Sequence, residues 1–244
     1  PRTPWGVPDF QGVWTADASY GIPLERADGI DPDAEVLTPE QAATRREQGT
    51  LRVMWGYDSD WHDTTLGHVR SAPSRQVSMV IDPSDGRIPE MTAAARQRLQ
   101  EARARRGGLP AGPEDLGDWE RCITRGLFPT PFIYNNGLQI VQAPEHVAIT
   151  TEMVHETRVV PTAAGPELGH EIAAYRGYAR GRWEGDTLVV ETTNFNGRAS
   201  YRGSSDQLTL TERYTRTGPE TLRYEFTLDD PATWVRPWTG MFAF

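Results

Sequence analysis

The sequence predicts a mainly β protein in which an antiparallel meander closes into a barrel. From Leu138 onward, short runs rich in Val, Ile, Thr and aromatic residues alternate with tight turns. Consecutive strands with short connections pair as antiparallel neighbours, and a meander of this length closes most simply into a barrel. The earlier half carries scattered Pro and Gly and few regular patterns. We therefore expect one domain, with main barrel strands in residues 120–244 and a partly helical elaboration, residues 16–119, covering one end.

Two helices are expected in the elaboration. The first begins at Thr38, whose side chain forms a capping box with Gln41, and it ends at Gly49. The second starts near Thr92 and ends at Gly107. Its apolar stripe is thin and consists of Ala95, Leu99 and Ala102. A stripe this narrow indicates a helix that lies on the surface with its arginines in water.

The strands follow from β-rich runs between turn signals. A strand that runs into a tight turn is expected within residues 75–89, between the two helices. The other expected features are a turn at 143–145 between two strands, hairpins about Gly185–Asp186 and Gly218–Pro219, and a final strand in 233–242.

Composition and missing motifs limit the function. A net charge of −9 argues against nucleic acid and anionic membranes as partners, and no apolar run approaches the roughly 18 residues that span a bilayer. The lone Cys122 excludes an internal disulfide. There is no G-x-S-x-G, Walker A, G-x-G-x-x-G or H-E-x-x-H motif, so we expect no nucleotide cofactor. A start at Pro1 suggests a processed, secreted or periplasmic form.

Period-two alternation predicts which side chains face the interior. Residues 146–162 read as one strand, because they are rich in β-branched residues and end at Pro161. On that strand His155 shares the apolar face, whereas Glu152 and Arg158 form an exterior pair. The same alternation places four more polar side chains inside, namely Asn194, Glu212, Tyr214 and Tyr224.

A buried carboxylate must be neutralised by a partner or serve a function. One alternative is structural: an Arg or a Tyr hydroxyl holds Glu212, and a backbone carbonyl satisfies His155. The other is a pocket in which His155 and Glu212 act as acid and base and tyrosines orient the ligand. The candidate catalytic residues are then His155, Glu212 and Tyr214.

Two loop segments add candidates. Tyr134 and Asn136 precede a strand and could reach the mouth of a barrel, although turn residues also cap strands. A dense set of potential ligands for a divalent ion comprises Asp58, Asp60, His62, Asp63 and His68. It matches no metal motif, and we expect no metal.

The chain resembles known proteins in two respects. Gly12-x-Trp14 near the start is similar to the G-x-W of lipocalins, in which an arginine covers the Trp; Arg236 is the candidate here. Segments such as "PDFQGVW", "SMVIDPSDGRIP" and "GRWEGDTLVVETTNF" resemble a large group of predicted secreted bacterial proteins without assigned activity. This resemblance implies export and a common β fold. His155, His170, Tyr57 and Trp61 match positions of that group, whereas the Asp and His cluster does not.

The leading hypothesis is an exported enzyme that performs cofactor-free acid–base chemistry, such as elimination, isomerisation or hydration, on a small organic molecule. One alternative is a lipocalin-like binding protein for an apolar or aromatic ligand, and another is a carbohydrate-active protein. The candidate substrate-binding residues are Tyr57, Trp61, Tyr134, Asn136, His170, Asn194 and Tyr224.

Overall fold

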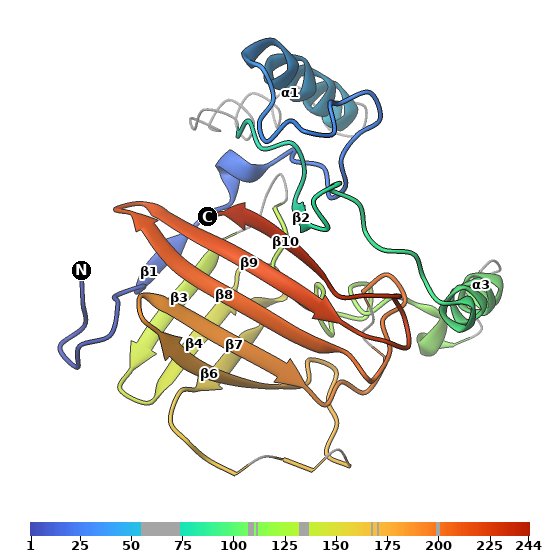
Figure 1. Ribbon diagram of the computed structural model, residues 1–244. Coiled ribbons are helices and arrows are strands. Elements are labelled where there is room, and N and C mark those ends of the chain that lie inside the picture. Colours follow the sequence, from blue (N-terminus) through green and yellow to red (C-terminus); the bar gives the residue numbers. More distant parts are fainter. Residues whose placement is uncertain are drawn as a thin grey trace.

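The computed structural model describes residues 1–54, 74–106, 110, 112–131, 137–166, 168–169, 171–198 and 201–244. Within these residues, antiparallel strands form two sheets, one in front of the other in the view of Figure 1. The four-stranded sheet has the order β1 (Gly12–Trp14), β3 (Leu138–Ala143), β4 (His146–Thr151), β5 (Thr157–Pro161). The six-stranded sheet has the order β2 (Val80–Asp82), β10 (Trp238–Ala243), β9 (Thr221–Asp229), β8 (Thr209–Gly218), β7 (Thr187–Thr193), β6 (Tyr178–Glu184).

The expected hairpins are confirmed. β3 and β4 pair across the turn at 144–145, and β8 and β9 pair on either side of residues 219–220. β6 and β7 are joined by Gly185 and Asp186. Gly185 has φ 60°, and a tight hairpin turn demands this left-handed conformation, which glycine adopts at little cost. The final strand is shorter than expected and begins at Trp238.

The two sheets enclose one hydrophobic core. Side chains of both sheets, among them Ile140, Val160, Leu188 and Phe226, belong to a single buried cluster. β5 and β6 lie side by side, and a Cβ at Gly181 would come 2.9 Å from Cγ1 of Val160. In the described part of the chain no backbone ladder joins these two strands. The architecture is therefore two facing sheets, and barrel closure is not confirmed.

Alternation along β7, β8 and β9 assigns their faces as the sequence predicts. The inward set is buried and comprises Leu188, Val190, Thr192, Leu210, Glu212, Tyr214, Leu222, Tyr224, Phe226 and Leu228. On the outward face, Arg213 and Arg223 pair with Glu225. The solvated exterior predicted for these residues is confirmed.

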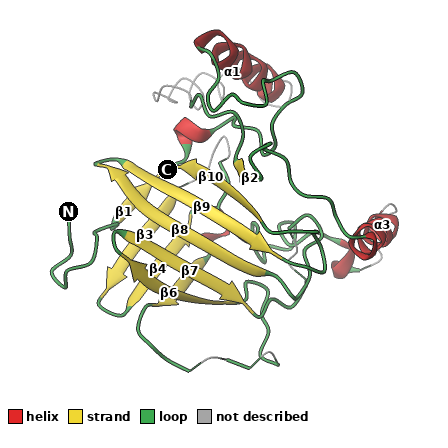
Figure 2. Ribbon diagram, viewed as in Figure 1, coloured by secondary structure: helices red, strands yellow, loops and turns green. Residues whose placement is uncertain are grey.

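Both helices lie outside the sheets (Figure 2). α1 (Pro39–Met54) begins with the expected capping box, in which the backbone N–H of Gln41 donates to Thr38 Oγ1 at 3.2 Å. The prediction that this helix ends at Gly49 is wrong, because a single glycine costs only about 1 kcal/mol inside a helix and does not by itself stop it. α3 (Ala93–Arg106) follows the prediction, with Ala95 buried.

The arginine that covers Trp14 is a different residue from the one expected. The Arg216 guanidinium lies 5.2 Å from the ring centroid of Trp14, whereas Arg236 pairs with Asp82 at 2.7 Å. Arg216 lies near the end of β8, and its contact with Trp14 of β1 is not evident from the sequence.

Candidate functional site

The segment 146–162 contains a reversal that the sequence does not signal. β4 ends at Thr151, a 3-10 turn covers Met153–His155, and β5 starts at Thr157. Val154 and His155 have φ values of 67° and 52°, an uncommon conformation for such residues. Without Gly, and with Pro only at the far end, this turn looks like continuous strand in the sequence. The single-strand prediction is therefore wrong.

The reversal moves His155 out of the interior. Its side chain is exposed, and Nδ1 lies 3.3 Å from the carbonyl oxygen of Glu152 in the same turn. The prediction that His155 and Glu212 share an interior is thus incorrect. The reversal also turns Arg158 inward, because its register partner on β4 is the buried Ile149 and paired residues point to the same face. The exterior assignment of Arg158 is corrected.

Arg158 and Glu212 form a buried ion pair at the seam between the sheets. The guanidinium binds both carboxylate oxygens, through Nη1 to Oε2 and through Nη2 to Oε1 at 2.8 Å. The Tyr214 hydroxyl donates to Oε1 at 2.8 Å, and the Tyr224 hydroxyl donates to the same oxygen at 3.0 Å. Glu212 is 0% exposed. We call these four residues the ion-pair cluster.

The electrostatics keep both members of the pair charged. Burial raises the pKa of Glu212, but Arg158 and the hydrogen bonds outweigh burial and hold this pKa below its ordinary value. Burial likewise opposes the charge of Arg158, and Glu212 overcomes it, so that the pKa of Arg158 is raised. Burial and the adjacent carboxylate raise the pKa values of Tyr214 and Tyr224 well above the usual range. None of these groups exchanges protons readily near neutral pH.

A second ion pair lies beside the cluster. Nε of Arg176 is 3.1 Å from Oε1 of Glu156, and the Thr124 hydroxyl donates to the other oxygen of Glu156 at 2.8 Å. Burial lowers the pKa of Arg176, and the nearby positive charge of Arg158 lowers it further. Two guanidinium groups therefore lie close enough to repel each other in a region with little water.

These two arginines line a cavity of about 550 Å³ at the edge strand β6. Arg180, Tyr178 and Glu191 also line it, and the loop that follows β5 contributes Leu168. The Arg180 guanidinium donates to the carbonyl of Pro166 in that loop. We call this space the arginine cavity. In the part of the chain that the structure describes, Nε of Arg158 is buried and has no hydrogen-bond partner.

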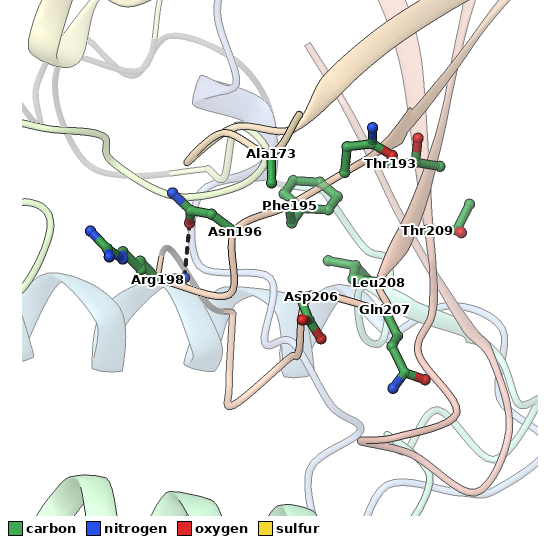
Figure 3. Close-up of a pocket in the computed structure, with 10 residues that line it drawn as sticks. Ala173, Thr193, Phe195, Asn196, Arg198, Asp206, Gln207, Leu208 and Thr209 are labelled. Atoms are coloured by element: carbon green, nitrogen blue, oxygen red, sulfur yellow. Dashed lines mark hydrogen bonds between the residues drawn. The ribbon is translucent and has the colours of Figure 1, made fainter. Parts of the chain in front are cut away.

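A second cavity, of about 820 Å³, adjoins the first (Figure 3). Thr193 and Asn194 line both cavities. Its polar lining includes Asn196, Arg198, Asp206 and Gln207, and we call it the adjoining cavity.

Asn194 fixes the loop between the two cavities. It is buried at the end of β7, with φ 56°, and its Nδ2 donates to the carbonyls of Gly169 at 2.9 Å and Ile172 at 3.1 Å. Asn194 is therefore buried, as predicted, but it lines the two cavities and does not join Glu212, Tyr214 and Tyr224 in the interior.

The other candidates divide into two groups. Glu212, Tyr214 and Tyr224 come together as predicted, in the arrangement of the structural alternative. The remaining candidates lie outside the described residues: Tyr57, Trp61, Tyr134, Asn136, His170 and the cluster Asp58, Asp60, His62, Asp63 and His68. The sequence analysis did not select Arg158, Arg176 and Arg180. The sequence contained one indication of Arg158, because a buried carboxylate at Glu212 needs a cation beside it.

Among the described residues, no group of three or more His, Cys, Asp or Glu side chains is suited to a metal ion. The same residues contain no helix with the length and apolarity to cross a membrane.

Fold and site together define a two-sheet antiparallel β protein with a buried ion-pair cluster behind an arginine-lined cavity. Comparison of the chain with protein-family models, with curated proteins and with solved structures finds no match in any of the three.

Proposed function

We propose that this chain is a binding protein for a small organic anion, which it holds by a carboxylate in the arginine cavity. One observation carries the proposal: three arginines line one cavity, and two of them are buried near enough that one charge lowers the pKa of the other. An anion between them relieves this repulsion. Guanidinium groups also match the geometry of a carboxylate with two parallel hydrogen bonds.

Two of the arginines are already held in place by carboxylates of the protein, and this supports binding. Arg158 is fixed from behind by Glu212 and approached by the Tyr214 hydroxyl at 3.3 Å, so its orientation is set before a ligand arrives. Arg176 is held by Glu156 through Nε. Such preorganisation reduces the ordering cost of binding. Tyr178 and Leu168, 38% and 42% exposed, offer apolar contact beside the charges.

The binding protein has more support than the acid–base enzyme of the leading sequence hypothesis. A general base needs a pKa near the working pH. Glu212 is held ionised by Arg158, and His155 is exposed in a turn. The proposed ligand class also differs from the apolar or aromatic ligand of the sequence alternative, because charged donors line the cavity.

Calorimetric titration tests the proposal with four probes, namely gluconate, benzoate, citrate and inorganic phosphate. We expect at least one carboxylate to bind and to raise the melting temperature with concentration. Arg180→Met and Arg176→Met should each weaken that binding roughly tenfold or more, since each removes a charge-assisted contact. Arg223→Met is the matched control, because Arg223 is exposed on the outer face of β9. If no carboxylate binds, or if the control weakens binding equally, the proposal is refuted.

A further inference from the structure

The arginine cavity and the adjoining cavity share a wall and lie along one face of the protein. Thr193 lines both, and in register with Tyr178 it belongs to the outer surface of the β6–β7 pair. The loop after β5 contributes Leu168 to one cavity and, further along, Ala173 to the other. Asn194, which lines both cavities, donates hydrogen bonds to two carbonyls of this loop.

The chemistry differs between the two ends. The arginine cavity presents guanidinium donors, which suit a carboxylate. The adjoining cavity offers the side-chain amides of Asn196 and Gln207 and the carboxylate of Asp206, which supply both donors and acceptors. Oδ1 of Asn196 also accepts from the Arg198 backbone N–H at 2.9 Å, which orients its Nδ2 donor (Figure 3). Asp206 and Gln207 are exposed, and Asn196 is half-buried. Groups that both donate and accept suit hydroxyls, which do the same.

An aromatic ring lies at the arginine end of this groove. Tyr178 lines the arginine cavity and is 38% exposed on the edge strand β6. The C–H face of a sugar ring can pack on such a flat apolar surface, while its hydroxyls turn to polar neighbours. A single elongated ligand would match this arrangement: a charged group at one end, an apolar face beside it and hydroxyls at the other end.

From these features we infer that the two cavities form one groove for a short acidic oligosaccharide. The carboxylate of its acidic unit binds among the arginines of the arginine cavity, the C–H groups of that unit pack on Tyr178, and a neutral sugar occupies the adjoining cavity. This inference rests on the proposed function, since it names the class of anion that the arginine cavity takes.

Three probes separate the two ends of the groove. Lactobionate carries a carboxylate at one end and a galactose ring at the other, gluconate has the acid without the galactose, and lactose has no carboxylate. Calorimetry should show that lactobionate binds roughly tenfold tighter than gluconate, because the galactose adds two or three hydrogen bonds. Lactose should bind at least roughly tenfold more weakly than lactobionate, because it lacks the charge-assisted contacts.

Substitutions then assign the gain to the adjoining cavity. Gln207→Ala and Asn196→Ala should each reduce the lactobionate affinity several-fold and leave the gluconate affinity within about twofold. Gln139→Ala, an exposed glutamine on the other sheet, is the matched control and should change neither. If gluconate binds but lactobionate binds no tighter, or if lactose binds as tightly as lactobionate, the oligosaccharide groove is refuted while the anion site stands. If no carboxylate binds, both proposals fail.

Discussion

Removal of Arg158 should destabilise the protein strongly, because it leaves a buried carboxylate without its cation. Glu212 is 0% exposed, and its remaining partners in the described chain would be the hydroxyls of Tyr214 and Tyr224. Breaking one side of a buried ion pair costs about 3–5 kcal/mol. For a domain of this size, 1 kcal/mol corresponds to about 2–4 °C in melting temperature. Arg158→Met should therefore lower the melting temperature by roughly 6–20 °C.

A double variant separates charge from packing. Arg158→Met combined with Glu212→Gln removes both buried charges, while the Gln carbonyl still accepts from the two tyrosines. We expect the double variant to recover most of the stability that Arg158→Met loses, because neither of the two substituted side chains carries a charge that would be buried without a partner. Urea unfolding followed by tryptophan fluorescence measures the free energy of unfolding for each variant.

Arg213→Met is the matched control for this experiment. Arg213 is adjacent to Glu212 in β8 but points outward, and its pair with Glu184 at 2.9 Å is 37% and 40% exposed. Exposed pairs contribute about 0–1 kcal/mol. The reasoning is wrong if Arg158→Met costs no more than Arg213→Met, or if the double variant is no more stable than the single one.

Three further predictions concern the same core. Because the pKa of Glu212 is lower in the folded than in the unfolded protein, its contribution to stability is present above its unfolded pKa of about 4.3 and is lost as the pH falls below it. Urea titrations should thus show the free energy of unfolding of the wild type falling relative to that of the Arg158→Met, Glu212→Gln double variant between about pH 5 and pH 3; a constant difference would contradict this assignment. Tyr224→Phe deletes a 3.0 Å hydrogen bond to a carboxylate and should cost roughly 1.5–3 kcal/mol in urea unfolding, with ligand affinity retained; an unchanged stability would show that the bond contributes nothing. Gly240→Ala should cost about 1–3 kcal/mol in thermal unfolding, because its Cβ would lie 2.3 Å from the ring of Phe226, and a neutral effect would mean that the ring can move aside.

The sequence alone determined the β class, the main hairpins and the inward face of β7, β8 and β9. Local physics explains this success. Alternation with a period of two records which face is buried, and tight turns need Gly, Pro or Asp at particular positions. Glu212, Tyr214 and Tyr224 could be placed together because β8 and β9 are joined by a short turn that fixes their register. Export and the family resemblance stay predictions.

Tertiary structure alone decided how the site is built. The turn at Val154 and His155 adopts positive φ without a glycine, so no local signal marked it, and a missed reversal assigns the following side chains to the wrong face. Arg158 is 54 residues from Glu212, and the two meet because β5 and β8 belong to different sheets that face each other across the core. Contacts between distant segments depend on how the two sheets pack around one core. Alternation within a single strand predicts which face a side chain is on, but it does not predict which residue of the other sheet that side chain contacts. The buried carboxylate of Glu212 indicates that a cation is needed, and only the packing of the two sheets places Arg158 beside it.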